Sequence, residues 1–199
     1  MSLIYRDKYA IWDGKPIEYT EKYYNKLKKY EGTQIEQDIN DIRYKLVKKY
    51  KCGTILDIGC GTGQFMRTAK TCTTYGYDVM KKTVSNLKRT KKYIDPYEQL
   101  PDQIQAFTFW DSLEHIKDPA PIFRNTWRGQ YLFCSMPIFK NTEAITQSKH
   151  YRPGEHMWYF TANGLIEWIH QFRFICVEEN YKESEAGRKD IGTFVFRRR

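Results

Sequence analysis

Short apolar runs alternate with amphipathic stretches along most of this chain. The clearest run covers residues 54–58, Thr-Ile-Leu-Asp-Ile, which is typical of a buried parallel strand. Three alternate glycines follow at once, at positions 59, 61 and 63, and residues 64–70 have a helix-forming composition. The sequence therefore predicts a unit of strand, glycine loop and helix.

The same alternation continues to the C-terminus. Predicted strands cover residues 73–78, 93–95, 105–110, 130–135, 174–178 and 193–196, and predicted helices cover residues 81–89, 119–127 and 161–171. Thr161 is suited to cap the last of these helices. Strands that alternate with helices indicate a doubly wound, mostly parallel sheet, with ligands bound at the carboxyl ends of the strands.

The N-terminal quarter of the chain has a different pattern. Residues 1–16 are predicted to be irregular, and residues 17–30 and 34–50 to form two polar helices. In the second helix, apolar residues fall at helical spacing on one face, and the opposite face is basic and includes Arg43. The helix pair is expected either to pack beside the sheet and partly cover the ligand, or to be a solvated pair without a role in the site.

Composition limits the class of protein. At 199 residues, the chain is expected to be one domain, with an N-terminal helical extension over residues 1–50 and a catalytic core over residues 51–199. A hydrophobic share of 41% is a globular value, and no apolar run approaches the ~20 residues of a membrane span. Five cysteines without a C-x-x-C pair indicate a reducing, cytoplasmic location without structural zinc.

Asp57 indicates which ligand the glycine loop binds. Glycines let the backbone bend sharply and approach a nucleotide-like ligand closely. However, the dinucleotide spacing G-x-G-x-x-G is not met, because Gln64 stands at its sixth position. A carboxylate ~4 Å from a pyrophosphate would be repelled by about 4 kcal/mol at an effective dielectric of 20, whereas an ammonium would be attracted equally. Asp57 therefore favours S-adenosylmethionine (SAM), which carries an ammonium and no phosphate, over NAD.

Residues 56–63, Leu-Asp-Ile-Gly-Cys-Gly-Thr-Gly, resemble motif I of the class I SAM-dependent methyltransferases. The resemblance implies a Rossmann-like, seven-stranded, mostly parallel α/β sheet with a reversed final strand. It implies that SAM is the cofactor and S-adenosyl-L-homocysteine the product. An acidic residue after the second strand holds the ribose in that family, and Asp78 stands at this position. The residues assigned to the cofactor are Asp57, Gly59, Cys60, Gly61, Gly63, Asp78, Asp95, Trp110 and Asp111.

A second stretch of sequence indicates which group of methyltransferases the chain resembles. Residues 107–119 contain Leu113-Glu114-His115 followed by Asp118-Pro119. This segment is similar to the fourth strand of small-molecule methyltransferases from ubiquinone, sugar and antibiotic pathways. Residues 131–137 and 156–165 resemble the fifth strand of those enzymes and the segment that enters their last large helix. The resemblance runs from about residue 54 to residue 196 and implies a small-molecule acceptor.

Asp95-Pro96-Tyr97 is similar to the D-P-P-Y motif of amino-group DNA methyltransferases. The second proline is missing, however, and the triplet follows the predicted third strand instead of the fourth. Asp95 is therefore expected near the adenine amine of the cofactor.

Three residues are candidates for chemistry at the acceptor. His115 is either a general base, which takes a proton as the methyl group arrives, or a ring that shapes the pocket. His156 and Tyr159 either line the acceptor pocket or belong to an aromatic core. Residues 138–160 around them are expected to form a mobile cap and not core. No spacing of His, Cys, Asp or Glu indicates a metal site, so no metal is expected.

The class of acceptor stays open. The chain has 33 basic and 24 acidic residues, which favours an anionic acceptor but also fits an AT-rich genome. An RNA-binding module is not recognisable in the sequence. Methyl transfer to an O or N nucleophile of a small, anionic acceptor is the first expectation. A tRNA or DNA methyltransferase is the second, and a non-catalytic SAM-binding protein is the third. The sequence does not indicate an oligomeric state.

Overall fold

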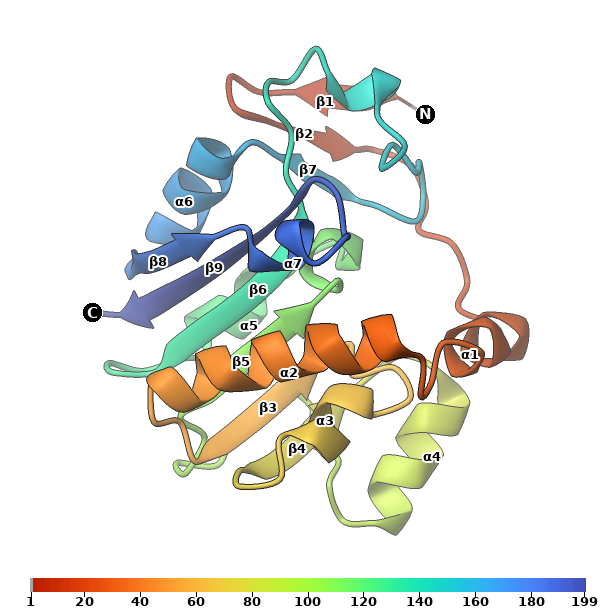
Figure 1. The fold of residues 1–199 in the computed structure, drawn as a ribbon. Coiled ribbons are helices and arrows are strands. Elements are labelled where there is room, and N and C mark those ends of the chain that lie inside the picture. Colours follow the sequence, from red (N-terminus) through yellow and green to blue (C-terminus); the bar gives the residue numbers. More distant parts are fainter. Residues whose placement is uncertain (1) are drawn as a thin grey trace.

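A computed structural model describes residues 2–199, so Met1, in the predicted irregular segment 1–16, lies outside the described residues. The main sheet has the strand order β4-β3-β5-β6-β9-β8. Its strands are β3 (Thr54–Ile58), β4 (Thr73–Tyr77), β5 (Ala106–Trp110), β6 (Tyr131–Pro137), β8 (Phe174–Asn180) and β9 (Ile191–Arg198). The first four run parallel, and β9 runs antiparallel to both β6 and β8. The predicted α/β architecture with a mostly parallel sheet is confirmed (Figure 1).

The sheet of the described residues has six strands and not the expected seven. The predicted third strand, residues 93–95, is reduced to one parallel bridge between Gly76 and Tyr93. The reason is local: Pro96 has no backbone N–H to continue the ladder. The Asp95 carboxylate also accepts a hydrogen bond from the Tyr97 N–H at 3.0 Å, which turns the chain away from the sheet.

Helices cover both faces of the sheet (Figure 1). One apolar core joins α2 (Gln34–Lys49) and α3 (Gln64–Thr68) to one face through residues such as Val47 and Phe65. A larger core joins α5 (Ala120–Arg124) and α6 (Ala162–His170) to the other face. The remaining helices are α1 (Glu21–Lys28), α4 (Lys81–Arg89), α7 (Lys182–Glu185) and the short 3-10 turns η1 (Leu113–His115) and η2 (Ile145–Gln147). The Thr161 hydroxyl caps α6 as predicted, by accepting a hydrogen bond from the Gly164 N–H.

The prediction that residues 1–16 are irregular is wrong. Strands β1 (Leu3–Tyr5) and β2 (Tyr9–Trp12) form an antiparallel hairpin, and β7 (Trp158–Phe160) adds to it as the third strand of a small second sheet. The partner strand lies about 150 residues away along the chain, so no local sequence signal could indicate the pairing.

The expectation that residues 138–160 are a cap without core is also wrong. Phe139, Ile145 and Tyr159 are buried and pack with Ala10 of β2 as a separate apolar cluster. This segment and the N-terminal hairpin therefore form one small body at the carboxyl edge of the main sheet. No helix among residues 2–199 has the length and apolar character needed to cross a membrane.

Candidate functional site

The glycine loop joins β3 to α3 in a backbone conformation that glycine favours. Gly59, Gly61 and Gly63 have φ values of +76°, +57° and +81°, in the left-handed region. At Gly59 there is also no room for a side chain, because a Cβ atom would lie 2.4 Å from the Cβ of Ser112. The loop is therefore held against the end of β5, at the carboxyl edge of the sheet.

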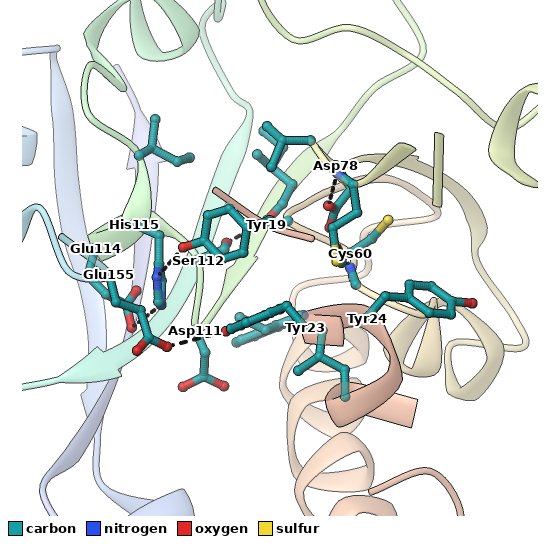
Figure 2. A pocket seen from close by; sticks show the side chains of 18 of the residues that line it. Tyr19, Tyr23, Tyr24, Cys60, Asp78, Asp111, Ser112, Glu114, His115 and Glu155 are labelled. Atoms are coloured by element: carbon teal, nitrogen blue, oxygen red, sulfur yellow. Dashed lines mark hydrogen bonds and ion pairs between the residues drawn. The ribbon is translucent and has the colours of Figure 1, made fainter. Parts of the chain in front are cut away.

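A cavity of about 1480 Å³ begins at this loop and extends to the segment after β5. Figure 2 shows how side chains from α1, the glycine loop and the η1 turn converge on it. The predicted site residues that line it are Asp57, Gly59, Cys60, Gly61, Asp78, Trp110, Asp111, His115 and His156. Three others, Gly63, Asp95 and Tyr159, do not line it. The fold thus brings together nine of the twelve residues chosen from the sequence.

Two buried carboxyl groups mark the end of the cavity nearest the glycine loop. Asp57 lies at the end of β3 and accepts a hydrogen bond from the Thr108 hydroxyl at 2.6 Å. Burial raises the pKa of Asp57 to about 7. Asp78 follows β4 and accepts hydrogen bonds from the N–H groups of Gly61 and Met80, both at 2.8 Å. Asp78 therefore fixes the shape of the glycine loop as well as facing the cavity.

The N-terminal helices line the cavity, in agreement with the expectation that they pack beside the sheet and partly cover the ligand. Tyr19, Tyr23, Tyr24 and Leu27 from the α1 region line it, and α2 contributes Asn40 and Arg43. Lys82 of α4 lies 4.9 Å from the ring centroid of Tyr24, which links α1 to the main body. The alternative of a solvated helix pair is wrong.

A buried charge cluster adjoins the cavity, and the sequence did not predict it. Arg43, placed on the exposed basic face by the helical pattern, is 8% exposed. It donates hydrogen bonds to Asp111 at 2.6 Å and to Glu183 at 2.8 Å. Arg188 donates to the same two carboxylates. We call Arg43, Asp111, Glu183 and Arg188 the arginine–carboxylate cluster. Burial alone would raise the pKa of Asp111, but the two guanidinium groups hold it below its ordinary value.

Two residues that the sequence assigned to the cofactor, Asp111 and Trp110, are in contact with the arginines of this cluster. Asp111 lines the cavity, but its carboxylate is already shared by two arginines. The Trp110 ring packs under the Arg43 guanidinium, whose carbon lies 5.1 Å from the ring centroid, and against Phe65. Both residues therefore have structural partners in addition to the cavity. Tyr97, which the sequence analysis did not assign to the site, lines the cavity, whereas its neighbour Asp95 does not.

Two histidines meet at the other end of the cavity. His115 lies in the η1 turn after β5, and its Nδ1 is 2.8 Å from the Tyr19 hydroxyl. The ring of His156 packs edge-on against it, with centroids 4.8 Å apart. Burial lowers the pKa of both rings, that of His156 to about 3. Both rings are therefore neutral near pH 7, and the same lowered pKa makes each a weaker base than a free imidazole.

Comparison with known proteins also indicates a methyltransferase. A family model described as a methyltransferase domain matches residues 24–179. One similar structure is an S-adenosylmethionine-dependent methyltransferase from Clostridium acetobutylicum ATCC 824, with 12% identity and a TM-score of 0.61 over 89% of this chain and 97% of that chain. Another is magnesium protoporphyrin IX methyltransferase (ChlM) from Synechocystis PCC 6803 with bound SAH, with 13% identity and a TM-score of 0.63 over 91% and 96%. The PH0226 protein from Pyrococcus horikoshii OT3 has 15% identity and a TM-score of 0.62 over 84% and 93%. A search of curated proteins found no match.

Proposed function

The chain belongs to the methyltransferase-domain family and is a SAM-dependent enzyme, and from this premise we propose that it methylates an oxygen or nitrogen atom of a small acceptor. The observation that carries the proposal is the continuous cavity, which has the glycine loop and two buried carboxyl groups at one end and two neutral histidines at the other. A cofactor at the first end would present its reactive group toward the second.

The residues present fit SAM well. Asp57 and Asp78 are 2% and 6% exposed and face the cavity beside the glycine loop. In this proposal Asp57 binds the ammonium of the cofactor and Asp78 the ribose hydroxyls, with Gly59, Cys60 and Gly61 beneath the methionine part. When bound, SAM supplies an activated methyl group on a positive sulfur. The protein then mainly has to align acceptor and donor, which can contribute about 7–11 kcal/mol to lowering the barrier.

His115 is the proposed general base. Its ring lines the cavity and is neutral near pH 7, so it can take a proton from an acceptor hydroxyl or amine. Tyr19 occupies its Nδ1 in this structure, so the acceptor must approach Nε2 or displace the Tyr19 hydroxyl. His156 is proposed to line the acceptor pocket, whereas Tyr159 belongs to the apolar cluster.

A small acceptor is favoured over a nucleic acid because several elements enclose the cavity. Residues from the α1 region, α2 and the segment between β6 and β7 all line it, and in this proposal they restrict access for a large polymer. Magnesium protoporphyrin IX methyltransferase, among the similar structures, is named for a small substrate. Lys26, Lys81 and Lys82 line the cavity together with eight acidic residues, so the proposal of an anionic acceptor rests on the excess of basic residues in the whole chain.

The experiment that tests this proposal follows labelled methyl groups. The protein is incubated with methyl-labelled SAM and either a metabolite extract or total nucleic acid. Label in the small-molecule fraction alone supports the proposal. Label in tRNA or DNA supports the second function, and SAM binding without transfer to either fraction supports a non-catalytic protein.

We also propose that residues 1–199 act as one domain. The N-terminal hairpin pairs with β7, and Arg43 of α2 reaches Asp111 and Glu183, so the described N-terminal residues, 2–50, pack against the rest of the chain and contribute to the cavity. The five free cysteines support the proposed cytoplasmic location.

Asp78→Ala is expected to weaken cofactor binding by about 1.5–3 kcal/mol, the usual contribution of hydrogen bonds to a charged group. The unliganded protein should also lose stability, because the N–H groups of Gly61 and Met80 lose their acceptor. Calorimetric titration with S-adenosyl-L-homocysteine measures the first effect and thermal melting the second. Unchanged affinity would exclude Asp78 from the ribose site. Asp95→Ala is the comparison, and a loss of affinity there would support the sequence-based assignment of Asp95 to the adenine.

Cofactor affinity is expected to depend on pH through Asp57. Because its pKa is raised to about 7, Asp57 is protonated in the unliganded protein below that pH, whereas a cofactor ammonium favours the carboxylate. Affinity should therefore fall as pH falls below 7, by up to about 10-fold per pH unit. The same raised pKa stabilises the unliganded fold at low pH, and this contribution is lost as pH rises through 7. Titrations between pH 5 and 7 measure the slope, and an equal slope in Asp57→Asn would contradict its assignment to Asp57.

A further inference from the structure

Three potential metal ligands converge at the acceptor end of the cavity. One ligand atom each from Glu114, His115 and His156 lies within 4.8 Å of the others. All three residues line the cavity, and Glu114 and His156 are buried. The sequence predicts no metal site, because His156 is far from the Glu114-His115 pair along the chain and only the fold brings it there. Figure 2 shows Glu114 beside His115.

We propose that Glu114, His115 and His156 bind a divalent transition-metal ion of the zinc type. Two imidazoles and one carboxylate are a ligand set that zinc uses in catalytic sites, with a further position left for water or substrate. Magnesium and calcium are a poor match, because they prefer oxygen ligands. Bonds of about 2.1 Å to a common ion require ligand atoms about 3.5 Å apart, so binding would draw the side chains together by roughly 1 Å.

The Glu114 carboxyl supplies an independent observation. Glu114 is 2% exposed, and its Oε2 has no hydrogen-bond partner among the described residues. Its Oε1 lies 3.7 Å from His115 Nε2, beyond hydrogen-bond distance. The neighbouring carboxylates differ, since Asp111 is shared by two arginines and Glu155 accepts from Arg152. A buried carboxyl oxygen without a partner is costly, and a metal ion would satisfy it.

The outer contacts of His115 also fit a metal ligand. A metal-bound histidine usually donates its second ring N–H to an oxygen, which fixes the ring. The Tyr19 hydroxyl lies 2.8 Å from Nδ1, so Nε2 is left to face Glu114 and His156. An unpaired Arg152 side chain would oppose a cation here, but Arg152 is paired with Glu155 at 3.3 Å.

The site would give the proposed methyl transfer a way to activate its acceptor. This consequence rests on the proposed function, whereas the metal site itself does not. A zinc-type ion in this position can bind an acceptor oxygen and lower its pKa, so that a stronger nucleophile is present at neutral pH. In the metal-bound protein, His115 would then act as a ligand, and the ion would replace it in activating the acceptor. The acceptor class that follows is a hydroxyl compound able to reach a metal ion through its oxygen.

Cobalt(II) is the probe for the test, because it occupies zinc sites and absorbs visible light. The chelator-treated full chain is titrated with Co²⁺, and zinc is then added in competition. The expected result is one equivalent of bound Co²⁺ with absorption bands that zinc removes. His156→Ala and Glu114→Gln should weaken binding by more than about 100-fold, and Tyr19→Phe by about 10–100-fold, as for outer contacts of other metal sites.

His170→Ala is the matched control, since His170 lies on α6 and does not line the cavity. It should leave the Co²⁺ affinity unchanged. Thermal melting of each variant shows whether it is folded. If His156→Ala does not fold, Glu114→Gln still tests the site, because glutamine has nearly the size of glutamate. The metal site would be contradicted if the unchanged protein does not bind one equivalent of Co²⁺. It would also be contradicted if Glu114→Gln and His156→Ala bind Co²⁺ with the affinity of the unchanged protein. Binding of S-adenosyl-L-homocysteine to the same metal-free sample would then show that the cofactor site stands without it.

Discussion

Glu183→Gln is expected to lower the free energy of unfolding by about 3–5 kcal/mol, the usual effect of removing one partner from a buried ion pair. Glu183 is fully buried and accepts hydrogen bonds from both arginines of the arginine–carboxylate cluster. Without its charge, Asp111 alone would balance two guanidinium groups, and Arg43 would stay buried. Urea unfolding followed by circular dichroism measures the loss.

The control for this prediction is Glu185→Gln on the same short helix. Glu185 is exposed, so the change should stay within about 0.5 kcal/mol. Equal small losses in the two variants would mean that the cluster contributes little to stability. Because Arg43 and Asp111 also line the cavity, Glu183→Gln should weaken cofactor binding as well.

Gly59→Ala is the second change with a large expected effect, about 2–4 kcal/mol of lost stability and a strong loss of cofactor binding. The left-handed conformation of Gly59, with φ at +76°, costs an alanine about 1–2 kcal/mol. Its Cβ would also lie 2.4 Å from the Cβ of Ser112, so either the loop or the end of β5 must move. Thermal melting and titration with S-adenosyl-L-homocysteine measure the two effects.

Gly129→Ala separates strain from the steric clash. Gly129 also has a positive φ, +94°, but nothing lies within 4 Å of the added Cβ. Gly129→Ala should therefore show only the cost of backbone strain. Adding Ser112→Gly to Gly59→Ala should restore part of the lost stability, because it removes the clashing Cβ. If Gly59→Ala and Gly129→Ala lower the free energy of unfolding equally, the close approach of the loop to Ser112 does not contribute to the loss.

The end of the cavity at the glycine loop could be predicted because its signals are local. Gly59, Gly61 and Asp57 lie within five consecutive residues, and a glycine loop between an apolar strand and a helix is typical of a site for a nucleotide-like ligand. Asp78 could be placed because the next strand is equally clear. The predicted third strand, residues 93–95, shows the limit of such patterns. Only one bridge forms there, between Tyr93 and Gly76, because Pro96 ends the pairing.

The other end could not be predicted, because its contacts join distant segments. Arg43 and Glu183 are 140 positions apart, and the helical pattern placed Arg43 on an exposed basic face. Tyr19 reaches His115 across 96 positions from a segment without a recognisable motif. The pairing of the N-terminal hairpin with β7 is of the same kind. Such contacts follow from the packing of the whole chain, and no spacing along it indicates them.

The central claim is that the cavity at the glycine loop holds SAM, and thermal melting with and without nucleotides tests it most directly. S-adenosyl-L-homocysteine at 100 times its dissociation constant should stabilise the protein by about 2.7 kcal/mol. For a chain of this size, that corresponds to a rise of roughly 5–11 °C in the melting temperature. NAD should leave the melting temperature unchanged, because Asp57 would face its pyrophosphate. A comparable rise with NAD, and none with S-adenosyl-L-homocysteine or SAM, would contradict the account.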